Sequence, residues 1–349
     1  MHSKQFLELM CSTQGASGYE CRVAHVVEEG FGRYCDEVRK DKLGNVIALK
    51  SGCHEPPRPR IMLAAHMDEV ALVVTKIEES GFLRFIHPGI DRRTLPAAEV
   101  VVHGRRDLPG LICVMPPHLL KPEDRQKSYK TDDLSISVGL SYEQVKEVVS
   151  VGDTVTMMRQ FTELQNRNVA AKALDDRAGV AVIYECLSEL SKMKHEADVF
   201  ACATVQEEPG LRGAIVAAYG IVPDLAVAID VGFGDQPGVP ESRQLTLDKG
   251  PGIALGPNVH PKLFESLKRC AEEYSVAYQL DVTPGRSGTD AWAIQVSREG
   301  VPTAILSIPT RNMHTSVEIT NLDDIKRAAR LLARFISSVD RAYVEGLVW

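Results

Sequence analysis

The stretch IMLAAHMDEVALVVTKIE (61–78) decides the fold class of this chain. It is a long apolar run, rich in β-branched residues, which is the composition of a β-strand. Charged residues break the run after His66, so we expect the strand to be interrupted near Asp68. The sequence on either side of this break indicates the type of domain to which the strand belongs.

The chain outside this stretch has the pattern of an α/β domain. Two helix-like segments, separated by the turn-and-cap sequence GASGYE (15–20), precede a strand-like NVIALK (45–50). From about residue 164 onward, helix-like segments such as 175–192 alternate with strand-like segments such as 198–205 and 225–230. Strands that alternate with helices predict a sheet covered on both faces. We therefore predict an α/β fold class, with a mixed sheet flanked by helices.

The segment between these two parts has a different texture. From about residue 70 to 163, short β-like pieces alternate with turns, and one helix-like piece, SYEQVKEVV (141–149), interrupts them. This pattern predicts a small β-rich unit. The simplest organisation is one α/β domain made of residues 1–68 and 164–349, with a β-rich domain of residues 69–163 inserted into it.

Charge and composition exclude several classes of function. The 40 basic and 47 acidic residues give a net charge of −7, so we predict no nucleic-acid partner. Because no run of 18 apolar residues is present, the sequence predicts no membrane-spanning helix and no membrane partner. The eight cysteines are scattered and form no CxxC motif, which indicates reduced thiols in a cytoplasmic protein.

Polar and charged residues gather in five short stretches at the ends of apolar segments. Ligands of open α/β sheets bind at the carboxyl ends of the strands. Five such stretches in one chain therefore predict one convergent site. They are AAHMDEV (64–70), KALDDRAG (172–179), VQEEPGLRGA (205–214), AIDVG (228–232) and NMHTSVE (312–318).

Each stretch also has an ordinary structural interpretation when it is taken alone. His66 and Asp68 share a face of an extended chain, so they are either a metal ligand with its orienting carboxylate or a strand-end histidine beside a solvated acid. Asp175 and Asp176 open a helix, where acidic residues commonly cap the N-terminus and face the helix dipole.

The remaining acids leave similar alternatives open. Glu207 and Glu208 are either a solvated turn or a working pair, and Pro209 indicates that their strand ends there. Asp230 ends a buried strand, where an unpaired carboxylate is costly, so it is expected to bind something. His314 taken alone is most simply a loop histidine.

Together, however, these residues form the ligand inventory of a two-metal site. Two histidines and four to five carboxylates, without a cysteine ligand, suit two divalent ions such as Zn²⁺, Co²⁺ or Mn²⁺. Two metals ~3.5–4 Å apart need a bridging carboxylate and a bridging water that attacks the substrate. A further carboxylate must take the proton of that water.

The pattern HxD…DD…EE…D…H resembles the co-catalytic two-metal aminopeptidases, and above all the M42 family of glutamyl and tetrahedral aminopeptidases, some of which carry endoglucanase labels. The stretches above, together with GTDA (288–291), PGIALG (251–256) and SVGDTV (150–155), look like that family's motifs. The resemblance covers almost the entire chain. The insert lies between His66 and Asp175, whereas related M20 peptidases carry theirs after the acidic pair.

The resemblance implies a ligand set and a reaction. His66 and Asp230 would bind one metal ion, Glu208 and His314 the other, and Asp175 would bridge both. The ions would be Zn²⁺ or Co²⁺, and the protein would remove N-terminal residues from peptides with a free N-terminus. The family also implies a large cytoplasmic homo-oligomer, often of twelve subunits, in which the inserted domain makes dimer contacts.

Three further acids receive roles from the same resemblance. Glu207 would be the general base that accepts the proton of the water between the metals. Asp68 would act with it in catalysis by orienting His66. Asp176 would be a supporting acid near the bridging carboxylate.

Other hypotheses remain beside this one. A glycoside hydrolase acting on β-glucans would use two carboxyls ~5–9.5 Å apart, which the adjacent Glu207 and Glu208 do not easily provide, and its mechanism has no place for histidine ligands. A non-catalytic scaffold would be expected to lose ligands, yet the full set is present. Arg286, in PGRSGTDA (284–291), either lines the substrate pocket and favours an acidic side chain or is a surface residue.

Overall fold

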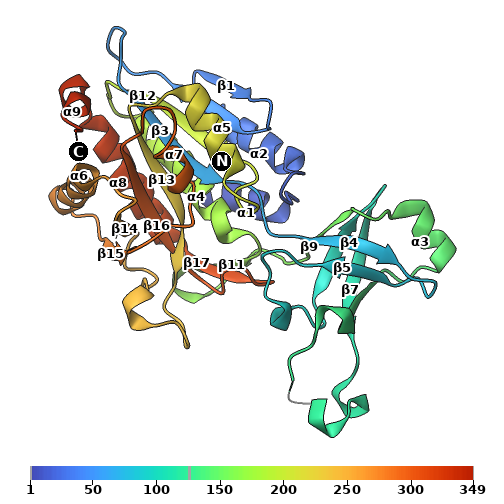
Figure 1. Cartoon of the computed structure of the whole chain (residues 1–349). Helices are drawn as coiled ribbons and strands as arrows, with labels where there is room; N and C mark the ends of the chain where they lie inside the picture. Colours follow the sequence, from blue (N-terminus) through green and yellow to red (C-terminus); the bar gives the residue numbers. More distant parts are fainter. Residues whose placement is uncertain (1, 125–126, 349) are drawn as a thin grey trace. The chain divides into compact units, whose positions relative to one another are not determined.

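The computed structural model describes residues 2–124 and 127–348. The chain forms two compact units. Unit 1 consists of Met1–Glu69, Phe161–Met313 and Glu318–Trp349. Unit 2 consists of Val70–Gln160 and the four residues His314–Val317. The protein is therefore α/β in unit 1 and mainly β in unit 2, as the sequence predicts (Figure 1).

Unit 1 contains a large mixed sheet and helices that pack on it. Its strands are β1 (Glu37–Lys40), β2 (Val46–Lys50), β3 (Arg60–His66), β10 (Thr162–Glu163), β11 (Asn168–Ala171), β12 (Asp198–Thr204), β13 (Leu225–Phe233), β14 (Gly252–Leu255), β15 (Gln279–Val282), β16 (Thr303–Arg311) and β17 (Glu318–Asn321). Its helices are α1 (Ser3–Ser12), α2 (Cys21–Phe31), α4 (Leu174–Leu190), α5 (Arg212–Ile221), α6 (Pro261–Glu273), α7 (Ala291–Ile294), α8 (Leu322–Ser337) and α9 (Arg341–Glu345).

The centre of this sheet is parallel. The strand order β1-β2-β12-β3-β13-β16-β17-β11-β10 places β3 between β12 and β13, and β16 beside β13, all four running in the same direction. Thr204 pairs with His66 across β12 and β3, and Ala228 pairs with Ala64 across β13 and β3. The carboxyl ends of these strands therefore meet at one edge of the sheet.

Alternating side chains of β3 bury the two faces of the sheet under different helices. Ile61, Leu63 and Ala65 belong to the core that includes α4 and α8, whereas Met62 and Ala64 belong to the core under α5 and α7. This follows from the two-residue period of a strand. Each such buried Leu or Ile contributes about 1.5–3 kcal/mol to stability. Burial in the core therefore fixes the register of the strand and the position of its carboxyl end in the sheet.

Unit 2 is built on a small closed sheet. Its elements are β4 (Leu72–Ile77), β5 (Leu83–Ile86), β6 (Glu99–His103), β7 (Asp107–Val114), β8 (Leu134–Ser137), α3 (Tyr142–Val148) and β9 (Thr154–Met157). Within the described residues the strands close in the order β4-β5-β8-β7-β6-β9, around a core of their inward-facing apolar side chains. Closure removes the exposed strand edges that a small open sheet would leave.

Several element boundaries match the sequence analysis and some do not. The apolar stretch 61–78 is interrupted as expected, because β3 ends at His66 and β4 begins at Leu72. Helix α7 covers only the four residues Ala291–Ile294. Strand β1 was not foreseen, since its mostly exposed residues EVRK carry no apolar pattern. No helix among the described residues has the length and apolar character needed to span a membrane.

Candidate active site

The sequence-predicted residues of unit 1 lie at or near the carboxyl ends of the parallel strands, although β13 continues to Phe233 and does not end at Asp230 as expected. His66 is the last residue of β3, and Asp230 lies in β13, two residues beyond the pairing of Ala228 with Ala64. Asp175 lies at the beginning of α4. This arrangement follows from the parallel order of the strands, because their carboxyl ends face the same side.

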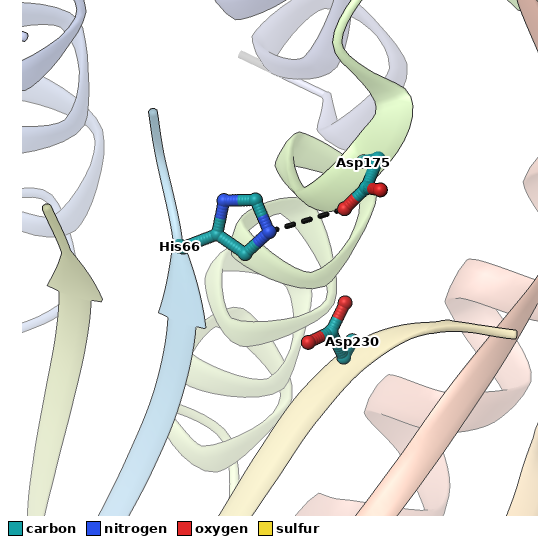
Figure 2. A group of neighbouring side chains, drawn as sticks. All are labelled: His66, Asp175 and Asp230. Atoms are coloured by element: carbon teal, nitrogen blue, oxygen red, sulfur yellow. Dashed lines mark hydrogen bonds and ion pairs between the residues drawn. The ribbon is translucent and has the colours of Figure 1, made fainter. Parts of the chain in front are cut away.

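Three of these residues form a compact buried group. Single ligand atoms of His66, Asp175 and Asp230 all lie within 4.8 Å of one another, and the residues are 2%, 6% and 7% exposed. Figure 2 shows the three side chains pointing toward one another from β3, α4 and β13. The dashed line joins Nε2 of His66 to Oδ1 of Asp175 at 3.1 Å.

The imidazole of His66 is oriented by Asp68. Nδ1 of His66 lies 3.2 Å from the main-chain oxygen of Asp68 and 3.5 Å from its Oδ1, so Nδ1–H donates on that side. Nε2 then faces Asp175. A histidine whose second nitrogen donates to an oxygen in this way is the usual form of a metal ligand.

Asp175 also belongs to a second group. One of its carboxylate oxygens lies within 4.8 Å of a carboxylate oxygen of Glu208. The main-chain N–H of Asp175 donates to Oε2 of Glu318 at 2.9 Å, which fixes the backbone at the start of α4. Asp175 thus has the position of a carboxylate shared between two groups of potential ligands.

Glu207 and Glu208 lie in a turn after β12. Gln206 has a φ of 52°, so the chain bends immediately before the two acids. Glu207 is 8% exposed, and its Oε2 lies 3.9 Å from Nε2 of His66. The carboxylate of Asp68 accepts the N–H groups of Glu207 and Glu208, at 3.0 and 3.3 Å. Asp68 therefore contacts both the histidine and the two glutamates.

Burial and mutual repulsion disfavour the ionised forms of several of these acids. Burial raises the pKa of Asp230 well above its usual value, and the charge of Asp175 adds to the shift. Burial also raises the pKa of Glu207 to about 9. Burial opposes protonation of His66, but its hydrogen bonds to Asp175 and Asp68 outweigh this and raise the pKa of the imidazole.

The donor set fits divalent metal ions. All candidate ligands are imidazole nitrogens or carboxylate oxygens, which Zn²⁺ and Co²⁺ accept. The buried carboxylates outnumber the buried cationic groups around them, and this excess of negative charge is costly without a compensating cation. The metal and catalytic roles of individual residues stay predictions at this point.

Asp176 supports the site through its hydrogen bonds. It is fully buried, and its Oδ2 accepts the N–H of His66 at 3.2 Å, while its Oδ1 accepts the N–H of Gly179 at 3.0 Å. Its carboxylate therefore joins the end of β3 to the first turn of α4. The expected supporting acid thus contacts the backbone of His66.

His314 lies in the loop between β16 and β17, and its segment belongs to unit 2. Its Nδ1 lies 3.0 Å from the main-chain oxygen of Gly89, which also belongs to unit 2. This contact has the same form as that of His66 with the Asp68 carbonyl. His314 remains a predicted ligand.

Arg286 lies beside an apolar cavity. Its guanidinium carbon is 5.4 Å from the centre of the Trp292 ring, and both residues line a cavity of about 640 Å³ formed mainly by α5, α7 and the segments next to them. Gly210, two residues beyond Glu208, also lines this cavity. None of the predicted metal ligands is among its lining residues. Arg286 is thus in a pocket, but the contacts do not link it to the ligand group.

Sequence reasoning missed several residues that hold the site in place. Their types were visible, but what they bond to depends on contacts across 51 to 186 positions of sequence. The sequence GASGYE (15–20) was interpreted only as a turn and cap, and no local pattern indicated what Ser17 and Glu20 contact. The missed residues are Ser17, Glu20, Asn45 and Glu318.

Comparison with known proteins identifies the family. The profile of the M42 glutamyl aminopeptidases matches residues 44–331. A lysyl aminopeptidase of Pyrococcus furiosus is 35% identical over 333 residues, which cover 94% of both chains. The structure of a TET aminopeptidase from a marine sediment archaeon of the Thaumarchaeota is 34% identical, with a TM-score of 0.93 and 99% of each chain covered. The TET1 peptidase of Pyrococcus horikoshii, described as assembling into a tetrahedron or a large octahedral shell, is 31% identical with a TM-score of 0.84, covering 97% of this chain and 100% of that one. With this fold and these relatives, the chain belongs to the M42 aminopeptidase family and is a peptidase.

Proposed function

We propose that this peptidase is a metal-dependent aminopeptidase that removes single residues from peptides with a free N-terminus. The observation that carries the proposal is the buried group of His66, Asp175 and Asp230, in which Asp175 also approaches Glu208. A shared carboxylate between two sets of nitrogen and oxygen donors is the arrangement that a pair of divalent ions requires.

Each proposed ligand has a place in this scheme. His66 and Asp230 would hold one ion, Glu208 and His314 would hold the other, and Asp175 would be shared by both. Zn²⁺ or Co²⁺ fits these donors. Two such ions would lower the pKa of the attacking water and polarise the carbonyl of the scissile peptide bond.

Glu207 is the proposed general base. Its carboxylate lies 3.9 Å from Nε2 of His66 and is not required as a ligand. It takes a proton from the attacking water and passes it to the leaving amine. Burial raises the pKa of Glu207, and nearby divalent ions would counter this and keep the carboxylate ionised. Asp68 assists by orienting both His66 and the Glu207 backbone.

The test of this assignment compares two conservative variants and the removal of metal. Chelation by EDTA or phenanthroline should abolish hydrolysis of aminoacyl p-nitroanilides, and Zn²⁺ or Co²⁺ should restore it. Glu207→Gln should keep its metal and lose about 10²–10⁴-fold in kcat. Glu208→Gln should lose both activity and bound metal. Full activity of a metal-free preparation would contradict the proposal, and loss of metal in Glu207→Gln alone would reverse the two roles.

The free N-terminus is the proposed recognition feature of the substrate. A neutral α-amino group can ligate a metal or meet a carboxylate such as Glu207 or Asp230. A free peptide should therefore lose one residue at a time, while its N-acetylated twin stays intact, as mass spectrometry can follow. Internal fragments from the acetylated peptide would indicate an endopeptidase. Comparing the hydrolysis rates of peptides that begin with Glu, Leu or Lys measures the preference for the first residue.

We further propose that the chain is a cytoplasmic homo-oligomer of about twelve subunits, in which the inserted domain 69–163 makes dimer contacts. The assemblies named for the Pyrococcus horikoshii relative support an oligomer, and the eight unpaired cysteines support a reducing compartment. Light scattering of the purified protein should give a mass many times that of the 38.3 kDa chain. A mass of one chain at all concentrations would refute it.

Hydrolysis of β-glucans is the alternative, and the site geometry opposes it. A glycosidase needs two carboxyls that flank the sugar bond, ~5–9.5 Å apart, and no histidine ligands. Here the acids are gathered around His66. A soluble cellulose derivative, assayed beside the peptides, should not be hydrolysed.

A further inference from the structure

The loop of residues 15–20 joins α1 to α2 and bonds to both segments that carry site residues. Gly15 exchanges two hydrogen bonds with Glu69: its carbonyl accepts the Glu69 N–H, and its own N–H donates to the Glu69 carboxylate. Oγ of Ser17 donates to Oδ2 of Asp68 at 2.6 Å. Glu20 reaches the other segment, because its Oε1 accepts the N–H of Gln206 at 3.1 Å.

These contacts are part of a continuous set around the turn that follows β12. Four consecutive N–H groups of this turn donate to side chains from the N-terminal part of the chain, and all four residues lie between the end of β12 and the beginning of α5. The bonds are Val205 N–H to Asn45 Oδ1 (2.9 Å), Gln206 N–H to Glu20 Oε1 (3.1 Å), Glu207 N–H to Asp68 Oδ1 (3.0 Å) and Glu208 N–H to Asp68 Oδ2 (3.3 Å). Side chains from the N-terminal part of the chain therefore hold the N–H side of this turn, while the carbonyl oxygens of Val205, Gln206 and Glu207 accept main-chain N–H groups of residues 210–213, at the beginning of α5.

The turn needs such support at Gln206. This residue has a φ of 52°, in the left-handed region that residues other than glycine adopt only at a cost of about 1 kcal/mol or more. The carboxylate of Glu20 accepts the Gln206 N–H in this conformation and so favours it.

Glu20 itself is placed for this contact and not for capping its own helix. It occupies the N-cap position of α2, but its side chain makes no capping hydrogen bond there. It is only 6% exposed, and Oε1 also accepts the N–H of Gly18 at 2.8 Å. Both donors therefore use one oxygen atom, which an uncharged glutamine would also supply.

We propose that Glu20 is a positioning residue for the general base. It fixes the backbone of Gln206, and so directs the carboxylate of Glu207 toward the reacting water, while Ser17 supports the same turn through Asp68. This inference rests on the proposed function of Glu207. A displacement of a reacting group by about 1 Å can lower the rate about 100-fold, so loss of the Glu20 contact should affect turnover more than substrate binding.

A double-mutant cycle tests whether Glu20 acts through Glu207. Glu20→Ala should lower kcat about 10- to 100-fold with KM changed less than about 2-fold, and Glu20→Gln should recover most of the rate because its carbonyl oxygen accepts both N–H groups. In a Glu207→Gln background, Glu20→Ala should cost less than about 2-fold more. Equal losses in the two backgrounds, or a Glu20→Gln variant as slow as Glu20→Ala, would overturn the proposal.

Hydrogen exchange gives a readout that does not depend on activity. In Glu20→Ala, the amides of 205–208 should exchange faster than in the wild type, and Glu20→Gln should restore protection. Asp324→Ala is the matched control: Asp324 is a fully buried carboxylate that accepts two N–H groups, from Asp248 and Gly250, outside this turn. It should leave kcat, KM and exchange at 205–208 unchanged.

The two measurements separate the two hypotheses. A wild-type protein without aminopeptidase activity would refute the proposed function, while exchange would still report whether Glu20 holds the turn. Unchanged exchange at 205–208 in Glu20→Ala would refute the positioning role even if the enzyme is fully active.

Discussion

Glu69 is expected to be a principal contributor to the stability of the segment that carries His66 and Asp68. Its carboxylate is 3% exposed and pairs with two buried cations, Lys172 at 2.7 Å and Arg177 at 3.1 Å. Replacing Glu69 by Gln keeps the shape of the side chain but leaves both cations buried without their counter-charge. Breaking a buried pair in this way typically costs about 3–5 kcal/mol.

The two cations would respond differently to the loss. Arg177 also donates to the main-chain oxygens of Met10, Thr13 and Met67, so its charge keeps acceptors in the variant. Lys172 depends more on Glu69. Burial, aided by the charge of Arg177, already lowers the pKa of Lys172 despite the attraction of Glu69. In Glu69→Gln this pKa should fall further.

The assay is urea unfolding followed by fluorescence. With an m-value of about 3 kcal/mol per molar urea, the expected loss lowers the midpoint by about 1–1.7 M. Adding Lys172→Met removes the unpaired ammonium and should recover about 1–3 kcal/mol. Because the folded-state pKa of Lys172 is lowered, the unfolded chain binds more protons between that pKa and about 10.5, so the stability of Glu69→Gln should rise as the pH rises toward 10.5. A loss below about 1 kcal/mol, without recovery in the double variant, would refute this reasoning.

Two further predictions concern other parts of unit 1. Burial lowers the pKa of His195, so the unfolded state binds an extra proton below about pH 6.5. The urea midpoint of unfolding should therefore fall between pH 7 and pH 5.5 in the wild type, and it should fall less in His195→Gln. An equal pH dependence of the two proteins would contradict this prediction. Gly213→Ala would place Cβ 2.4 Å from Oδ1 of Asn45 and from the carbonyl oxygen of Val205, so this substitution should cost about 1–3 kcal/mol of stability. It should also lower kcat, because Asn45 supports the turn before Glu207. Thermal melts and kinetics together test this, and a variant as stable and fast as the wild type would exclude it.

Much of the architecture was predictable from local patterns. The apolar stretch 61–78 and its break near Asp68 predicted the end of β3, because burial on both faces demands a continuous apolar run and charged residues terminate it. Alternating helix-like and strand-like segments predicted the α/β class. The expectation that charged stretches converge at strand ends followed from parallel topology alone, and the group of His66, Asp175 and Asp230 agrees with it.

Other features depended on contacts that no local pattern encodes. Strands β11 and β17 pair although their partner residues are 147 to 153 positions apart in the sequence, and the segment His314–Val317 belongs to unit 2 although its sequence neighbours belong to unit 1. The residue types of the proposed ligand set could be predicted from the sequence itself, since histidines and carboxylates gathered at strand ends are the donors that divalent cations accept. The position of Glu207 was decided only by the tertiary structure, because Asp68, Glu20 and Asn45 meet its turn across long stretches of chain, and side chains that accept main-chain N–H groups leave no periodic signal in the sequence.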